Sequence, residues 1–304
     1  MKQIFNFIFY GFCTFAISAC TAEEEELTSN NNSQEKMTVS FRVRAHGTSD
    51  QINKDNTHKE DFVDNIVLAG SSLATYDGAV ATFNINSFIG KKNFFFVANL
   101  KQEDQTRIGA AGTESDFNAL HLNTADYLRG YASNPPDKSI VMAATLRDVT
   151  VQGAVLSQEQ VKLKRLFAKV NYDFTTGVFA GLTIQKITLE NIPAKFAIGG
   201  PIDNYDLKNK KETANYPYLT YQLSNNKGTV YLPEHFVSNP AFRSPDAHGM
   251  THFVITHLKR GVVETLKLRI GVSTPYSTSY GQIQRNKEIT PIVTEDLNNN
   301  IWLN

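Results

Sequence analysis

Short runs of apolar residues at every second position occur along this chain, and this alternation most restricts the fold that it can adopt. The clearest run is Met37, Val39, Phe41 and Val43, with a polar residue between each pair. A period of two places one set of side chains in a core and the other in water, as in a half-buried β-strand. The run Phe94–Ala98 is apolar throughout and indicates a strand buried on both faces.

Further strand signals follow, separated by turn residues, and the 20 Phe and 12 Tyr side chains suit a pleated surface. The strands expected beyond these two lie at residues 62–68, 79–83, 140–143, 149–151, 161–173, 182–190, 216–223, 229–233, 251–258, 262–272 and 282–293. Only Thr113–Leu128 has a partly helical pattern, with Thr113 or Ser115 as its cap. The sequence therefore predicts an all-β protein with at most one or two short helices.

The length of the chain, 304 residues, fits two domains better than one β-sandwich. The most natural boundary is the segment Gly153–Val161, which precedes a long strand signal. We therefore expect an N-terminal β-sandwich at residues 36–157 and a C-terminal β-sandwich at residues 158–304.

The first 19 residues have the pattern of a lipoprotein signal peptide. A cationic start at Lys2 precedes an apolar run that is too short to span a bilayer as a helix. The small residues Ser18 and Ala19 then stand directly before Cys20, as in a lipobox, in which the cysteine becomes the acylated N-terminus. An ordinary signal peptide with an incidental cysteine is the alternative. Two or three acyl chains on Cys20 would anchor the protein in the outer membrane, because one chain alone binds weakly.

Residues 20–35 are expected to form a disordered tether. The acidic run Glu23–Glu26 resembles the surface-export signal of Bacteroidetes lipoproteins, and it also fits a solvated spacer. Leu27–Glu35 is rich in Ser, Asn and Gln and has too few apolar residues to order itself. The N-terminal region therefore predicts a protein displayed at the cell surface.

Composition argues against several kinds of chemistry. Both cysteines, Cys13 and Cys20, lie in the N-terminal region, so the body of the chain has no disulfide, thiolate zinc site or cysteine nucleophile. Lys and Arg total 30, as do Asp and Glu, so no net charge attracts nucleic acid. No phosphate-binding loop, nucleophile elbow or HExxH motif occurs. We expect no cofactor and no enzymatic activity.

Two polar groups remain as candidate sites. The best metal ligands are Asp246, His248, His252 and His257. On a strand, however, His252 and His257 point to opposite sides, so we expect solvent-facing histidines and no metal site. Lys162 and Lys164, beside Arg165, share one side of a strand, which favours an exposed face over a nucleic-acid patch.

Several segments occur in an order that resembles a known family. They are Arg44-Ala45 behind the strand Met37–Val43, Phe95–Asn99, Ile140–Ala143, Lys162–Val170, Ile187–Pro193, Val230–Glu234 and Arg285-Asn286. With the lipobox at Cys20, they resemble the fimbrillin family, the pilus subunits of Bacteroidetes. The resemblance covers nearly the whole mature chain and implies two β-sandwich domains of transthyretin-like topology. It also implies a structural subunit of a surface fimbrium that supports cell adhesion.

The resemblance also implies an assembly mechanism. An Arg-directed protease cuts behind the first strand, and loss of this strand exposes an apolar groove, which the C-terminal strand of a neighbouring subunit fills by β-augmentation. Here the displaced strand would be Met37–Val43, the outermost strand of its sheet. The cut would fall between Arg44 and Ala45, because Arg44 directly follows the strand. An exposed residue at the strand end is an equally good interpretation of Arg44.

The C-terminal residues are the candidate donor. They are Ile289, Ile292, Val293, Ile301, Trp302 and Leu303. Fimbrillin stalk subunits extend further beyond Arg-Asn than this chain does, and Pro291 fits an edge strand better than a central one. Residues 301–303 either fill a groove or fold back onto the core. The shorter tail favours a terminal or accessory subunit, at the tip or as a membrane-retained anchor.

Other functions remain open. A surface glycan-binding lipoprotein would also be an exported β-sandwich, although Trp302 as the only Trp gives little support for a sugar-stacking surface. A secreted hydrolase with an unrecognised carboxylate pair is the weakest alternative. The expected partners are other fimbrial subunits, the outer membrane through the lipid anchor, and a host surface protein or glycan.

Overall fold

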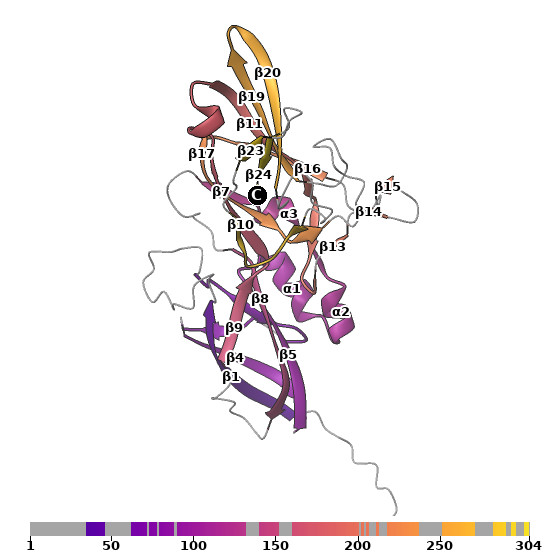
Figure 1. Ribbon diagram of the computed structural model, residues 1–304. Coiled ribbons are helices and arrows are strands. Elements are labelled where there is room, and N and C mark those ends of the chain that lie inside the picture. Colours follow the sequence, from indigo (N-terminus) through magenta and orange to yellow (C-terminus); the bar gives the residue numbers. More distant parts are fainter. Residues whose placement is uncertain are drawn as a thin grey trace, which may run out of the picture. The chain divides into compact units, whose positions relative to one another are not determined.

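Strands make up most of the described residues in a computed structural model, which confirms the predicted all-β class (Figure 1). The structure describes residues 35–45, 62–71, 73–77, 79–87, 90–131, 140–151, 160–200, 202–203, 205–206, 211–212, 218–236, 251–270, 282–289, 293–295 and 301–303.

The strands of the N-terminal half are β1 (Glu35–Ala45), β2 (Ile66–Leu68), β3 (Thr75–Tyr76), β4 (Val80–Ser87), β5 (Gly90–Ala98), β6 (His121–Asn123), β7 (Arg129–Tyr131), β8 (Met142–Val151) and β9 (Gln160–Arg165). Those that follow are β10 (Phe167–Asp173), β11 (Thr183–Pro193), β12 (Lys195–Ala197), β13 (Ile202–Asp203), β14 (Tyr205–Asp206), β15 (Lys211–Glu212), β16 (Tyr218–Leu223), β17 (Lys227–Pro233) and β18 (His235–Phe236). The last are β19 (His252–Lys259), β20 (Val262–Arg269), β21 (Gln282–Ile283), β22 (Glu288–Ile289), β23 (Val293–Glu295) and β24 (Ile301–Leu303). The helices are α1 (Gln102–Gly109), α2 (Glu114–Asn118), α3 (Thr124–Tyr127) and a 3-10 turn at Gly177–Phe179.

Seven strands of the N-terminal half follow one another in the order β2-β5-β8-β9-β1-β4-β3. Strand β1 is antiparallel to β4 and parallel to β9, so it lies inside the sheet and not at its edge. The expectation that Met37–Val43 forms an outermost strand is therefore wrong. Two segments distant in sequence hydrogen-bond to β1 on opposite sides: β4 along Glu35–Arg42 and β9 along Arg42–Ala45.

The inward face of these strands forms the first core. Phe41 lies at its centre, with its ring centroid 5.0 Å from that of Phe96, 5.1 Å from Phe94 and 6.3 Å from Phe83. The first two pairs meet edge to face, which is a favourable arrangement of aromatic quadrupoles. Every second residue of β1 contributes to this core, as the alternation predicts.

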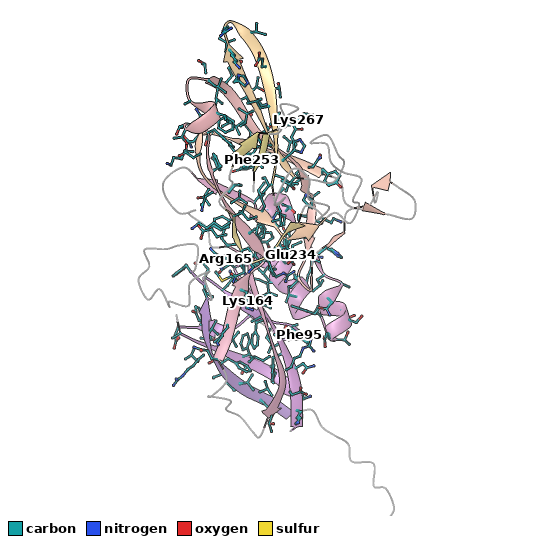
Figure 2. The ribbon with its side chains drawn as sticks, viewed as in Figure 1. Phe95, Lys164, Arg165, Glu234, Phe253 and Lys267 are labelled. Carbon is teal, nitrogen blue, oxygen red and sulfur yellow. The ribbon has the colours of Figure 1, made fainter. Side chains whose placement is uncertain are left out.

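Two sheets of the C-terminal half enclose a second core. Their strand orders are β16-β11-β19-β20-β24-β23 and β22-β10-β17-β7. The core joins Ala168, Val170 and Tyr172 of β10 to residues of β11, β17 and β19, including Phe253, which is labelled in Figure 2. This arrangement is a β-sandwich, whereas the transthyretin-like strand order stays a prediction.

A third core contains residues from both predicted domains. Phe167 and Phe196 pack edge to face, with centroids 4.9 Å apart, beside Phe95 and Phe117 of the N-terminal part. The chain passes from the first sheet to the next at Leu166, which interrupts the run predicted as one strand at residues 161–173. Strand β9 pairs with β1 and β8, while the predicted boundary itself lies in residues 152–159, outside the described residues. The division at 157/158 therefore stays a prediction.

The helices exceed the predicted number of one or two. Helix α1 escaped prediction because it has no apolar stripe, and only Asp104 and Ile108 of its residues are buried. Helix α2 begins at the predicted cap Thr113, which forms a reciprocal capping box with Asp116. The expected helix at 113–128 is interrupted by β6, which pairs with β12. No helix in the described part of the chain has the length and apolarity needed to cross a membrane.

Asn99 connects three segments of the N-terminal half. Its backbone has a φ of 64°, a left-handed conformation that asparagine tolerates better than most residues. Its side-chain amide donates to the carbonyl oxygens of Phe62 (2.8 Å) and Ile140 (2.7 Å), and its carbonyl oxygen accepts from the Asp64 amide (2.8 Å). These bonds explain why an asparagine directly follows the end of β5 at Ala98.

Replacement of Asn99 by Asp removes the side-chain N–H donors, so the carbonyl groups of Phe62 and Ile140 lose these hydrogen bonds. We expect the Asn99→Asp variant to lose about 2 kcal/mol of unfolding free energy, measured by chemical denaturation at pH 7. Asn225→Asp, in the exposed turn before β17, is the matched control and should change stability by less than about 0.5 kcal/mol. Equal stability of Asn99→Asp and wild type would show that these bonds contribute nothing.

The position of Phe41 in the first core predicts how much stability its truncation would cost. Truncation to alanine leaves a cavity among three aromatic rings, so Phe41→Ala should lower the unfolding free energy by about 3–5 kcal/mol. Thr38→Ala, on the exposed face of the same strand, should cost less than about 1 kcal/mol. Similar losses in the two variants would contradict the burial pattern of β1.

Candidate assembly interface

Strand β1 changes its main partner along its length. Residues Glu35–Arg42 pair with β4, and Arg42–Ala45 pair with β9. The amide of Val43 also donates to the carbonyl oxygen of Ala79, 2.8 Å away, so contact with the β4 side continues past Arg42. Removal of β1 would leave unpaired backbone groups on both β4 and β9, at positions that meet at Arg42.

One face of β1 is buried from Met37 to Val43. The exposed fractions of Met37, Val39, Phe41 and Val43 are 9%, 0%, 0% and 6%. The opposite face is polar: the Thr38 hydroxyl donates to Asn84 and the Ser40 hydroxyl bonds that of Thr82. Strand β1 therefore covers an apolar trough whose walls are β4 and β9 and whose floor includes Phe94 and Phe96.

The candidate cleavage site lies inside β1. Arg44 is paired with Lys162 and Ala45 with Leu163 of β9, so Arg44 does not follow the strand as the sequence suggested. The alternation ends at Val43, but backbone pairing continues two residues further, which side-chain pattern alone does not reveal. A protease would therefore have to bind this bond after the last residues of β1 separate from β9.

The candidate donor residues pair within the chain's own sheets. Ile289 of β22 is paired with Val170 of β10. In the other sheet, Ile301 and Trp302 of β24 pair with β20, and Val293 pairs with Leu303. The structure therefore favours the fold-back alternative for residues 301–303. Ile292 lies outside the described residues, as do Cys20 and the rest of the predicted signal peptide and tether up to residue 34.

Two segments of the family resemblance meet in space. The Arg285 backbone amide donates to the Glu234 carboxylate (3.2 Å), and the Arg285 guanidinium forms an ion pair with it. The same guanidinium donates to the carbonyl oxygen of Ile198 at 2.9 Å. Asn286 has a φ of 57°, and its amide donates to the Phe167 carbonyl (3.0 Å). The Arg-Asn pair therefore fixes a turn beside the start of β10.

The basic run on β9 has two faces. Lys162 and Lys164 are exposed on one side, as predicted, whereas Arg165 on the other side is 2% exposed (Figure 2). The Arg165 guanidinium carbon lies 5.9 Å from the ring centroid of Tyr231. Arg165 therefore belongs to the interior and only the two lysines contribute to the surface.

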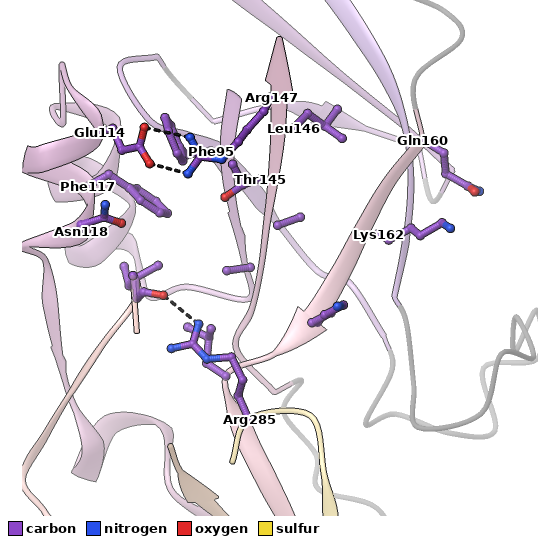
Figure 3. A pocket seen from close by; sticks show the side chains of 16 residues that line it. Phe95, Glu114, Phe117, Asn118, Thr145, Leu146, Arg147, Gln160, Lys162 and Arg285 are labelled. Carbon is purple, nitrogen blue, oxygen red and sulfur yellow. Dashed lines mark hydrogen bonds and ion pairs between the residues drawn. The ribbon is translucent and has the colours of Figure 1, made fainter. Parts of the chain in front are cut away.

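Lys162 and Lys164 line a pocket of about 480 Å³ between β8, β9 and α2 (Figure 3). The Arg147 guanidinium donates two hydrogen bonds to the Glu114 carboxylate at this site, at 2.5 and 3.0 Å. These bonds lower the pKa of Glu114 and raise that of Arg147, so both groups stay charged and neutralise each other. No sequence pattern indicates this pocket, because its residues come from six separate segments.

The histidine pair of the candidate metal site is buried. His252 and His257 are 3% and 1% exposed, so the expectation of solvent-facing side chains is wrong. Strand β19 lies between β11 and β20 in its sheet, so both of its edges are paired. Each Nε2 atom is 3.8 Å from a carboxylate oxygen, that of Glu190 for His252 and that of Glu264 for His257. Asp246 and His248 lie outside the described residues, and no three metal-ligating side chains group together in the described ranges.

Comparison with known proteins identifies the fold. No family model matches the chain, and no curated protein matches its sequence. The structure of the tip fimbrial protein Mfa3 from Porphyromonas gingivalis, with a C-terminal truncation, aligns with a TM-score of 0.55 at 16% identity, over 89% of this chain and 98% of that one.

Two further solved structures are similar, both described as candidates for cell adhesion. One, from Parabacteroides distasonis, has a TM-score of 0.53 at 12% identity, and the alignment covers 84% of this chain and 87% of that one. The other, from Bacteroides eggerthii, has a TM-score of 0.52 at 16% identity and covers 88% of both chains. At these identities the likeness concerns the fold, and it agrees with the resemblance to fimbrillin. The chain has the fold of Bacteroidetes fimbrial and cell-adhesion proteins.

Proposed function

We propose that this protein is a structural, non-enzymatic subunit of a cell-surface fimbrium that joins its neighbour by strand exchange at the site of β1. One observation carries the proposal: β1 pairs with both β4 and β9, and its side chains Met37, Val39, Phe41 and Val43 lie in the core. The fold shared with a tip fimbrial protein and with candidates for cell adhesion supports the fimbrial role.

The energetics favour a replacement strand over an empty trough. Burying a large apolar side chain stabilises a protein by about 1.5–3 kcal/mol, so the four inward residues of β1 together contribute on the order of 6–12 kcal/mol. Loss of β1 would expose these surfaces and the facing edges of β4 and β9, a state prone to aggregation. A neighbour's strand with apolar residues at alternate positions would restore both the burial and the backbone pairing.

The C-terminal strands support a position at one end of the filament. In the proposed mechanism a stalk subunit both accepts a strand and donates one. Here β24 pairs with β20 and β23 pairs with β24, so these segments already complete the subunit's own sheet. A subunit that accepts a strand without donating these residues would stand at the tip.

Export and anchoring form the remaining part of the proposal. Acylation at Cys20 would hold the precursor on the outer membrane while β1 is still in place. Cleavage between Arg44 and Ala45 would then release the lipid anchor and β1 in one step, because both precede the cut. Separation from the membrane and opening of the trough would thus be coupled.

Cleavage can be tested with two arginine variants of the purified chain. After treatment with an Arg-specific protease, the wild type mixed with a donor subunit should form complexes that resist SDS. Arg44→Gln should stay monomeric, because β1 cannot be released. Arg42→Gln, an exposed position on the same strand, is the matched control and should form the same complexes as the wild type.

Two results would contradict the proposal. One is equal assembly of Arg44→Gln and wild type. The other is a chain beginning at Ala45 that folds but binds neither a donor subunit nor a synthetic peptide of residues 35–44. Specific oligosaccharide binding by such a permanent monomer would instead favour the glycan-binding alternative.

A further inference from the structure

Strands β8 and β9 separate from each other soon after they meet. Their pairing is limited to Met142 with Arg165 and Ala143 with Lys164. Continuation of this register would pair Thr145 with Lys162 and Arg147 with Gln160, but these residues line the pocket of about 480 Å³ instead (Figure 3). The pocket is therefore a wedge between two strands of one sheet, and we name it the β8–β9 wedge.

The backbone of β8 presents hydrogen-bonding groups to this wedge. The Leu166 amide donates to the Val141 carbonyl at 2.9 Å, so the odd-numbered residues of β8 direct their backbone groups toward β9. The next odd residue after Ala143 is Thr145, and beyond Leu146 the register with β5 shifts at a β-bulge. No strand in the described ranges pairs with this side of β8 beyond Ala143. The edge therefore has free positions for an added strand.

Side chains around the wedge differ on its two faces. Thr145, Lys162 and Lys164 lie on the exposed side. Leu146 packs against the first core, and Val161 belongs to it. Because side chains alternate along a strand, a segment inserted here would direct every second residue to the lysines and the others to the apolar core.

The charge of the wedge is positive. Arg147 is neutralised by Glu114, and Arg285 by Glu234. Lys162 and Lys164 form no ion pair with the described residues, and as i and i+2 on a strand they lie about 7 Å apart. Two lysines at this spacing match two carboxylates at alternate positions of an extended chain.

We propose that the β8–β9 wedge binds an extended segment of a partner protein in which acidic residues alternate with apolar ones. Main-chain hydrogen bonds to Thr145 give affinity, and the two lysines give selectivity for acidic side chains. The wedge volume lies within the usual range of ligand pockets, which suits a short segment. This site is separate from the trough under β1 and does not depend on the proposed assembly.

A peptide fits these features better than a sugar. A glycan could pair with the lysines, but it has no regular row of amides to match the backbone of β8. The aromatic rings lining the wedge, Phe95 and Phe117, are only 8% and 3% exposed and offer no open face for a sugar ring. The chain's own Glu23–Glu26 run lacks apolar residues at alternate positions and serves as a charge-matched control.

The test uses the full chain with β1 in place and a synthetic peptide that alternates Glu with Val. Isothermal titration calorimetry should detect its binding, which weakens as salt rises. Lys162→Gln and Lys164→Gln should each reduce affinity about three-fold, and the double variant about ten-fold. Lys91→Gln, an exposed lysine of β5 outside the wedge, should leave affinity unchanged. Glu114→Gln should increase affinity, because it frees the charge of Arg147.

Residue-resolved amide exchange separates strand addition from simple charge attraction. The bound peptide should slow exchange of the Thr145 amide, while the Ala144 amide, already directed toward β5, should change little. Three results would overturn the proposal: no binding, equal binding of a peptide with the Glu23–Glu26 sequence, or binding of an acidic oligosaccharide in place of the peptide. Because β1 stays in place throughout, none of these outcomes bears on strand exchange.

Discussion

The burial of one face of β1 between β4 and β9 is the constraint on which the N-terminal half of this protein depends. The strand supplies Phe41 at the centre of the first aromatic core, and it connects two strands that have no direct contact in the sheet order. An edge strand could be lost with little damage to its neighbour. An internal strand cannot, and this property makes its replacement by another chain energetically plausible.

Strand β9 extends this dependence to the rest of the chain. It pairs with the end of β1 on one side and with the start of β8 on the other, and then leads directly into β10 of the next sheet. Residues 160–163 of β9 pair with β1 and only Lys164 and Arg165 pair with β8, so the sheet opens at Thr145 and Arg147. The opening is thus a consequence of how one short strand serves two neighbours.

Side-chain periodicity explains which parts of this architecture the sequence predicts. The alternation at Met37–Val43 and the apolar run Phe94–Ala98 lead to the correct strands and core residues, because burial on one or both faces leaves a direct pattern. The identity of a strand's neighbours in the sheet leaves no pattern in its sequence. Neither the position of β1 inside the sheet nor the pairing of Arg44 with Lys162 could therefore be predicted. The burial of His252 and His257 likewise depends on neighbours distant in sequence. Helix α1 escaped prediction because its residues are mostly polar.

The most direct measurement is a structure of the assembled filament at a resolution that traces individual strands. Strand exchange predicts that the position between β4 and β9 is occupied by a strand from a neighbouring subunit, with an apolar side chain where Phe41 lies in the isolated chain. A filament in which each subunit retains its own residues 35–45 at this position would contradict strand exchange.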